Sequence, residues 1–144
     1  PVNCDLICKD DRIYVIEITG RAGATCLPEM VGLYYGINYY EAIVRLAMGM
    51  DVRFMFRKDA PHRANLSKIL TSDRDGTVKA IHNDNPEAED IIDLSFNIEP
   101  GEQVHRYTNG RDRIGQIILT GDSLYGCEAR LQEILSKINI EFTE

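Results

Sequence analysis

The sequence predicts an α+β fold in which an antiparallel sheet and a few helices precede a small β-rich tail. Residues 3–18 have the pattern of two strands around a tight turn, and residues 28–48 have the spacing of helices. From residue 51 onward, short strand-like segments alternate with glycine-containing turns, and one last helical segment follows. We therefore expect two domains, 1–50 and 51–144, of which the second is mainly β-structure.

The chain is expected to begin with a β-hairpin formed by residues 3–9 and 13–18. A three-residue turn, Asp10-Asp11-Arg12, would place Asp5 directly opposite Glu17. A two-residue turn would instead set Cys4 against Glu17 and move Asp5 to the other face. We therefore expect Asp5 and Glu17 to share one face of the hairpin. The other face is then apolar and carries Cys4, Leu6, Cys8, Tyr14, Ile16 and Ile18.

Two helices are predicted after a glycine-containing loop at residues 19–26. Pro28 suits the first turn of a helix, where its missing N–H costs little, and Gly36 suits its end. The second helix should cover about 39–48 and end at Gly49. Its apolar face is predicted from four side chains at helical spacing, namely Tyr40, Ile43, Val44 and Ala47.

The remainder of the chain is predicted to be strands and turns, followed by a final amphipathic helix. Turns are indicated at Asp75-Gly76, Pro100-Gly101 and Asn109-Gly110. The helix should cover about 123–138, with Asp122 or Ser123 as its cap. The expected strands are 52–57, 66–70, 77–82, 91–98, 103–106, 114–120 and a closing strand at 139–143.

Composition narrows the class of protein. A net charge of -7 disfavours binding to nucleic acid. No segment approaches the roughly 18 consecutive apolar residues of a membrane helix.

Cys4 and Cys8 would lie about 13 Å apart along a strand, too far to share a disulfide or a metal. Buried free thiols are therefore favoured over zinc, and a cytoplasmic location is expected. The opening Pro1-Val2-Asn3, without a Met, suggests a segment of a longer protein.

The candidate residues for a metal and ligand site are Asp5, Glu17 and Arg21. Two facing carboxylates repel unless a cation or base offsets their charge, and Mg²⁺ with a nucleotide suits such a pair. Arg21 follows at the start of the loop, and its guanidinium can hold a phosphate or carboxylate with two hydrogen bonds. Gly20 and Gly23 would let a ligand approach the backbone. The alternative is a solvated sheet face on which Arg21 pairs with Glu17 or Glu29.

The run from Val2 to Leu6 and the run from Arg12 to Thr25 resemble the metal-binding hairpin and substrate loop of ATP-grasp carboxylate–amine ligases. This is the family of the amino-acid ligases and carbamoyl-phosphate synthases. Asp5, Glu17, Arg21 and Gly23 match its pattern, whereas Thr19 stands where Asn is common. The resemblance implies that Asp5, Glu17 and Thr19 bind metal, that Arg21 is catalytic and that Gly23 contacts the cofactor.

The second half resembles the small β-rich tail of amino-acid-ligase-like members of the same family. The matching segments are Pro100–Val104, Asp112–Gly115, Thr120–Asp122 and Glu128-Ala129, whereas 51–95 matches poorly. The resemblance implies that 1–50 closes an ATP-grasp core and that 51–144 is its C-terminal subdomain.

The function implied by the resemblance is an ATP- and Mg²⁺- (or Mn²⁺-) dependent ligase that forms an amide-type bond through an acylphosphate. The expected partners are the upstream ATP-binding portion of the same ligase and small carboxylate and amine substrates, and a homodimer is left open. Because the nucleotide-gripping half lies upstream in that family, this chain is expected to be inactive alone. The alternatives are a non-catalytic β-rich interaction domain and a subunit of a split ligase.

Overall fold

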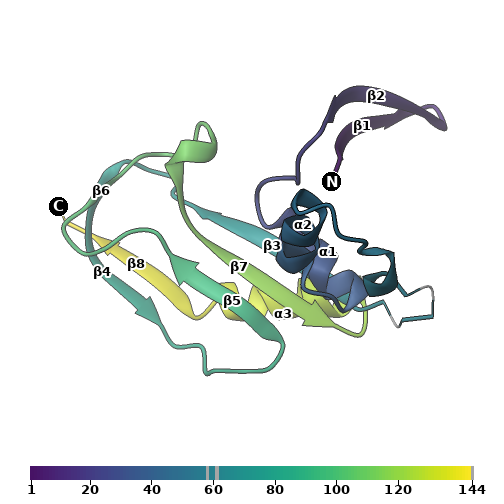
Figure 1. The fold of residues 1–144 in the computed structure, drawn as a ribbon. Coiled ribbons are helices and arrows are strands. Elements are labelled where there is room, and N and C mark those ends of the chain that lie inside the picture. Colours follow the sequence, from purple (N-terminus) through teal and green to yellow (C-terminus); the bar gives the residue numbers. More distant parts are fainter. Residues whose placement is uncertain (58, 61, 144) are drawn as a thin grey trace. The chain divides into compact units, whose positions relative to one another are not determined.

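The computed structural model describes residues 1–57, 59–60 and 62–143, which form two compact units, Pro1–His62 and Arg63–Glu144. The predicted division fell after residue 50. All strand pairs within the named strands are antiparallel, which confirms the α+β class with antiparallel sheets. Figure 1 shows the elements in chain order. In the part of the chain that is described, no helix has the length and apolarity needed to cross a membrane.

The first unit opens with the strands β1 (Asn3–Lys9) and β2 (Arg12–Thr19), which pair only with each other in the described part of the chain. The predicted three-residue turn is wrong, because Lys9 pairs with Arg12 and the turn is Asp10-Asp11. Both aspartates have positive φ, 51° and 56°. A two-residue hairpin turn of this kind has a backbone twist that matches the twist of the two strands it joins. Asp5 nevertheless lies opposite Glu17, because the register shifts between Asp5 and Leu6.

This shift is a β-bulge, and it changes the composition of both hairpin faces. Leu6 pairs with Val15 and Asp5 pairs with Glu17, so Ile16 is the extra residue on β2. Tyr14 therefore lies opposite Ile7, on the face of Asp5, and not on the predicted apolar face. Side chains that are opposite each other lie on one face. The apolar face consists of Cys4, Leu6, Cys8, Ile13, Val15 and Ile18.

The two predicted helices are present as α1 (Leu27–Tyr35) and α2 (Tyr39–Ala47). Gly36 ends α1 with a φ of 64°, and the Asn38 side chain accepts a hydrogen bond from the Glu41 N–H to cap α2. The predicted apolar face of α2 is wrong. Its most buried residue is Ala42, whereas Tyr40 and Val44 are 54% and 58% exposed.

The predicted strand at 52–57 is also wrong, because residues Arg53–Met55 form a short 3-10 helix. Asp51 explains this local structure. Its carboxylate accepts from the backbone N–H of Arg53 at 2.9 Å and from the Arg53 side chain at 2.9–3.2 Å. A short polar side chain that bonds to the backbone two residues later competes with strand formation.

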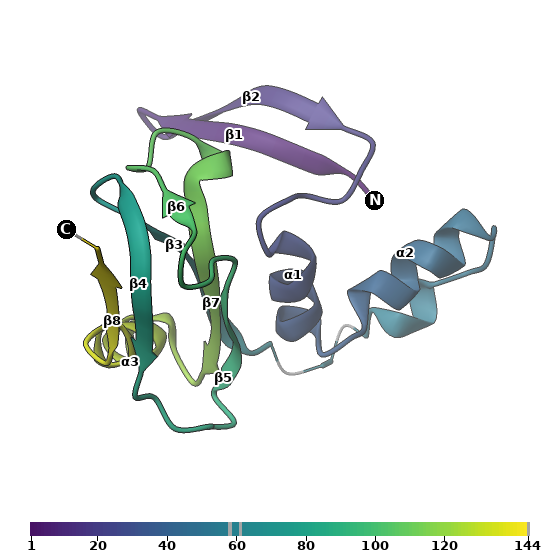
Figure 2. The ribbon, with the colours of Figure 1, turned by 90° about the vertical axis from the view of Figure 1, so that its left-hand side faces the viewer.

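The second unit contains two three-stranded sheets, ordered β3-β7-β5 and β6-β4-β8. Figure 2 shows β4 and β8 side by side, and β5 and β7 in the other sheet. The bounds are β3 (Ala64–Thr71), β4 (Gly76–Asn83), β5 (Ile91–Phe96), β6 (Gln103–Val104), β7 (Arg113–Gly121), α3 (Leu124–Leu135) and β8 (Ile138–Phe142). These correspond to the predicted segments, with α3 ending three residues earlier than expected.

The core of the second unit is centred on β7, which lies between β3 and β5. Ile117, Ile118 and Leu119 are at most 1% exposed, because both faces of this central strand are covered. Gly115 permits the close approach of β5, since a Cβ there would lie 2.3 Å from the carbonyl oxygen of Ser95. Helix α3 packs on β3 and β7 and contributes Leu131 and Ile134 to the core. Ser123 caps this helix, as predicted.

None of the four cysteines forms a disulfide in the described part of the chain. Cys26 and Cys127 are buried as expected, whereas Cys4 and Cys8 are exposed because the hairpin face on which they lie is uncovered.

Candidate metal and substrate hairpin

Four polar residues form a patch at the open end of the hairpin. Asp5 lies opposite Glu17, and Asn3 lies opposite Thr19. Residues two apart along a strand point to the same face, so all four side chains project from one face. The Asn3 amide donates to the Asp5 carboxylate at 3.0 Å, which orients one of the two acids. Sequence reasoning missed Asn3, although its place two residues before Asp5 was a usable signal.

Thr19 is the predicted metal ligand that departs from the family pattern. Its hydroxyl oxygen is buried and has no hydrogen-bond partner among the described residues. A buried hydroxyl without a partner is unfavourable by roughly 1–3 kcal/mol. A cation or a water at the patch would satisfy it. The described residues contain no group of three or more His, Cys, Asp or Glu side chains placed for metal binding. Any metal here therefore depends on two carboxylates, neutral oxygens and other ligands.

Arg21 begins the loop between β2 and α1 and is exposed. One guanidinium nitrogen donates to the backbone oxygen of Ala22 at 2.9 Å. Among the described residues, Arg21 forms no ion pair with Glu17 or Glu29, which were the alternatives raised from the sequence. Its charge is therefore not neutralised within the described chain.

Gly23, in this loop, lies close to Asn3 at the start of β1 and to Leu27 at the start of α1. A Cβ at this position would lie 2.5 Å from the Leu27 side chain and 2.9 Å from the Asn3 amide oxygen. A larger residue at this position would force the Leu27 and Asn3 side chains to move. The predicted contact of Gly23 with a cofactor remains a prediction.

Glu29, in the first turn of α1, connects the two helices. The Tyr40 hydroxyl donates a hydrogen bond to Glu29 Oε1, and this bond, together with burial and the charge of Glu29, raises the pKa of Tyr40. Glu29 Oε2 is buried without a hydrogen-bond partner in the described part of the chain. The hydrogen bond between Tyr40 and Glu29 links α1 to α2.

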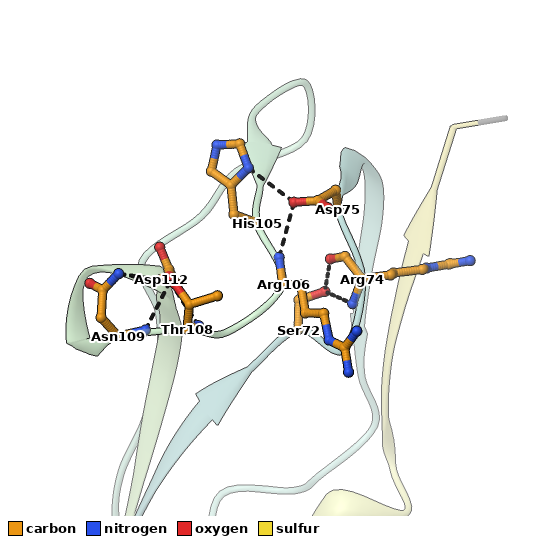
Figure 3. Close-up of polar contacts among 8 residues, drawn as sticks. All are labelled: Ser72, Arg74, Asp75, His105, Arg106, Thr108, Asn109 and Asp112. Carbon is orange, nitrogen blue, oxygen red and sulfur yellow. Dashed lines mark hydrogen bonds and ion pairs between the residues drawn. The ribbon is translucent and has the colours of Figure 1, made fainter.

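A second polar cluster lies in the other unit and is structural in character (Figure 3). Asp75 accepts from the Arg106 N–H at 3.2 Å and lies 3.1 Å from His105 Nδ1, and these contacts lower the pKa of Asp75. Asp112 Oδ2 accepts from the Thr108 hydroxyl and N–H and from the Asn109 N–H at 2.7–3.0 Å. These bonds lower the pKa of Asp112. The cluster fastens the β3–β4 turn and the segment before β7 to backbone groups.

The chain is similar to known ligases and carboxylases. Residues 68–143 match the family described as L-amino acid ligase C-terminal domain 2. Phosphoribosylglycinamide synthetase from Anaerococcus prevotii superposes on 99% of this chain with a TM-score of 0.90 and 36% identity, and 37% of that protein is covered. For L-amino acid ligase from Bacillus licheniformis the TM-score is 0.83 at 20% identity, over 99% of this chain and 36% of that one.

A more distant structure is the biotin carboxylase domain of Hydrogenobacter thermophilus 2-oxoglutarate carboxylase, in complex with MgADP, ADP and bicarbonate. Its TM-score is 0.74 at 16% identity, over 99% of this chain and 32% of that one. The present chain thus spans about a third of the length of each of these proteins. The chain belongs to the L-amino acid ligase C-terminal domain 2 family, and its fold is that of the C-terminal part of an ATP-grasp ligase.

Proposed function

We propose that this chain forms one wall of the active site of an ATP- and Mg²⁺- (or Mn²⁺-) dependent ligase. In that reaction a substrate carboxylate takes the γ-phosphoryl group of ATP, and ADP leaves. An amine then attacks the acylphosphate, phosphate leaves, and the nitrogen loses a proton as the amide-type bond forms. The observation that carries the proposal is the buried Thr19 hydroxyl without a partner beside the facing pair Asp5 and Glu17.

Asp5, Glu17 and Thr19 are the residues that would hold the metal. Two carboxylates with a neutral oxygen suit Mg²⁺, which usually combines few protein carboxylates with phosphate oxygens and water. When bound, the metal supplies positive charge that offsets the charge of the phosphates. The MgADP complex of the biotin carboxylase domain supports this assignment by analogy of fold.

Arg21 would contact the acylphosphate or the substrate carboxylate. Its guanidinium is exposed and lacks an ion-pair partner in the described residues, so its charge remains available to a ligand. A planar guanidinium can donate two parallel hydrogen bonds to a phosphate or carboxylate, which fixes orientation as well as charge.

The apolar face of the hairpin supports the presence of a further protein segment. Leu6, Ile13, Val15 and Ile18 are between 53% and 70% exposed, and β1 and β2 have no other strand partner among the described residues. A two-stranded ribbon is marginal in water unless it packs on something. We propose that the upstream ATP-binding portion of the ligase covers this face. A separate chain of a split ligase would cover it equally well.

The test uses the full-length protein that carries this segment. Binding of Mn²⁺ in the presence of ATP is measured by electron paramagnetic resonance. Asp5→Asn and Glu17→Gln should each weaken Mn²⁺ binding at least about tenfold, since each removes a full charge next to the ion. Thr19→Val should weaken it less, because a neutral oxygen is lost.

The matched control is Asp11→Asn, which removes the same charge from the turn of the same hairpin. Asn tolerates the positive φ at this position, so the fold should be kept. Equal Mn²⁺ affinities for Glu17→Gln and Asp11→Asn would remove the metal site from this hairpin.

A further inference from the structure

The side chain of Asn3 lies between two parts of the proposed site, the Asp5 carboxylate and the loop of residues 20–26 (the Arg21 loop). Asn3 begins β1, and the β2 residue opposite it is Thr19, the last residue before this loop. Figure 2 shows the start of β1 beside the end of β2, from where the loop runs on to α1. Asn3 is therefore placed to contact both parts.

One end of the Asn3 amide is bonded to Asp5. Asn3 Nδ2 donates to Asp5 Oδ1 at 3.0 Å. Because an ionised carboxylate only accepts hydrogen bonds, the amide nitrogen must be the end that faces Asp5. A neutral donor restricts the orientation of the carboxylate without cancelling the negative charge that a metal ion needs. Asn3 is therefore suited to orient a metal ligand.

The oxygen of the same amide faces Gly23. A Cβ added to Gly23 would lie 2.9 Å from Asn3 Oδ1, which is close enough to force the amide to move. Since the amide group is planar, a displacement of Oδ1 also moves Nδ2 and disturbs its bond to Asp5. The same Cβ would lie 2.5 Å from the Leu27 side chain, which would have to move as well.

Gly20 provides a comparison within the same loop. A Cβ added to Gly20 meets nothing within 4 Å in the described part of the chain. Neither Gly20 nor Gly23 has a positive φ, so alanine brings no left-handed backbone strain at either position. Room for the Asn3 amide is therefore required at Gly23 and not at Gly20.

We propose that Asn3 is a positioning residue that couples the Arg21 loop to Asp5, and that Gly23 leaves the space this residue needs. The inference rests on the proposed function, because it requires Asp5 to hold the metal. The metal and Arg21 would act on the same transferred group, and such groups must be held close to one geometry. A contact that runs from the loop through Asn3 to the metal ligand supplies this registration.

A purely structural role for Asn3 predicts a different result. The bond between Asn3 and Asp5 is exposed, and the pairing of Asn3 with Thr19 is made by the backbone, which other side chains leave intact. Loss of such a bond should change the stability of the fold little. Replacing Asn3 should therefore weaken metal binding without a matching loss of stability.

The experiment measures the dissociation constant of Mn²⁺ in the presence of ATP, by electron paramagnetic resonance of the full-length protein. Asn3→Leu keeps the size of the side chain but has no donor, and Asn3→Ala removes both. Each should raise the dissociation constant roughly fivefold, less than for a buried partner of a metal ligand, since this bond is exposed. The midpoint of thermal unfolding should stay within about 2 °C of the wild type.

The role of Gly23 is tested by its dependence on Asn3. Gly23→Ala should raise the Mn²⁺ dissociation constant about fivefold when Asn3 is present, and less than about twofold in the Asn3→Ala protein, where no amide is displaced. The contact with Leu27 is the same in both proteins and cancels in the comparison. Gly20→Ala is the matched control and should leave the dissociation constant unchanged in both.

Unchanged Mn²⁺ affinity in both Asn3 variants would overturn the inference, and so would equal effects of Gly23→Ala with and without Asn3. Asp5→Asn distinguishes this failure from failure of the proposed function. If Asp5→Asn weakens Mn²⁺ binding and the Asn3 variants do not, the metal site stands and the coupling is wrong. If Asp5→Asn also has no effect, the metal site is wrong and the coupling falls with it.

Discussion

The two compact units of the chain bury very different shares of their apolar side chains. In the described part of the chain, ten of the buried apolar residues lie in the second unit and three in the first. The exposed large apolar residues show the reverse distribution, with sixteen in the first unit and four in the second. The whole contiguous core cluster belongs to the second unit. Because apolar burial is the main source of folding stability, the second unit has the means to fold by itself, whereas the first has much less of this stabilisation.

The largest expected effect is seen when the two units are separated. A fragment of residues 63–144 should fold cooperatively, since both of its sheets and its core are contained in it. A fragment of residues 1–62 should lack stable tertiary structure. Thermal unfolding by circular dichroism, together with dispersion of amide proton shifts, measures both. A cooperative transition in the 1–62 fragment would contradict the comparison.

A single side chain should show the same contrast within the chain. Ile117→Ala removes a fully buried side chain from β7 and should lower the free energy of unfolding by about 2–5 kcal/mol. Ile18→Ala acts on a residue that is 63% exposed and should change it by less than about 0.5 kcal/mol. Urea denaturation of both variants measures the two changes in the free energy of unfolding. Similar losses would mean that the hairpin face is covered within this chain.

The next test compares Glu17 with Arg12, a charged residue at the turn of the same hairpin, in the full-length ligase. Glu17→Ala should lower kcat/KM by roughly a hundredfold or more, because a full charge at the proposed metal site would be lost. Arg12→Ala, at the turn of the same hairpin, should have little effect. Steady-state kinetics measures both, with folding checked by circular dichroism. Equally small losses for the two variants would reduce Glu17 to a surface charge.

Arg21 provides a second, graded test of the same site. Arg21→Ala should cost about 1.5–3 kcal/mol in transition-state stabilisation, and Arg21→Lys should recover only part of it, because Lys lacks the planar fork. The measurement is kcat/KM for each variant. Full recovery by Lys would show that charge alone matters.

The smallest effect is expected from the polar cluster of the second unit. The pKa of Asp112 is lowered from 3.8 in the folded chain, first by the Thr108 hydroxyl and then by backbone N–H groups. Its contribution to stability is therefore present above about pH 4 and is lost as the pH falls through the lower, folded pKa. The loss of stability caused by Asp112→Asn should be smaller at pH 2.5 than at pH 6, because part of the wild-type carboxylate is then protonated. Urea denaturation at the two pH values measures this, and a loss of the same size at both would refute the assignment.

The local sequence was sufficient for most elements. Pro28 and Gly36 bound α1, and Ser123 caps α3, because these residues have strong intrinsic preferences for helix ends. The pairing of Asp5 with Glu17 was also predicted, although the turn used to predict it was wrong. The roles of Asp5, Glu17, Thr19, Arg21 and Gly23 remain predictions that rest on family resemblance.

Tertiary structure decided the rest. A bulge at Ile16 restored the register that the two-residue turn would have broken, and pair counting cannot reveal a bulge. Ala42 is the buried position of α2, a helix in contact with α1, whereas Tyr40 and Val44 are exposed. The unpartnered oxygens of Thr19 and Asn85 are visible only once their surroundings are folded. Sequence thus determined where elements begin and end, through local backbone preferences, whereas faces, register and unsatisfied groups depended on contacts between residues distant in the chain.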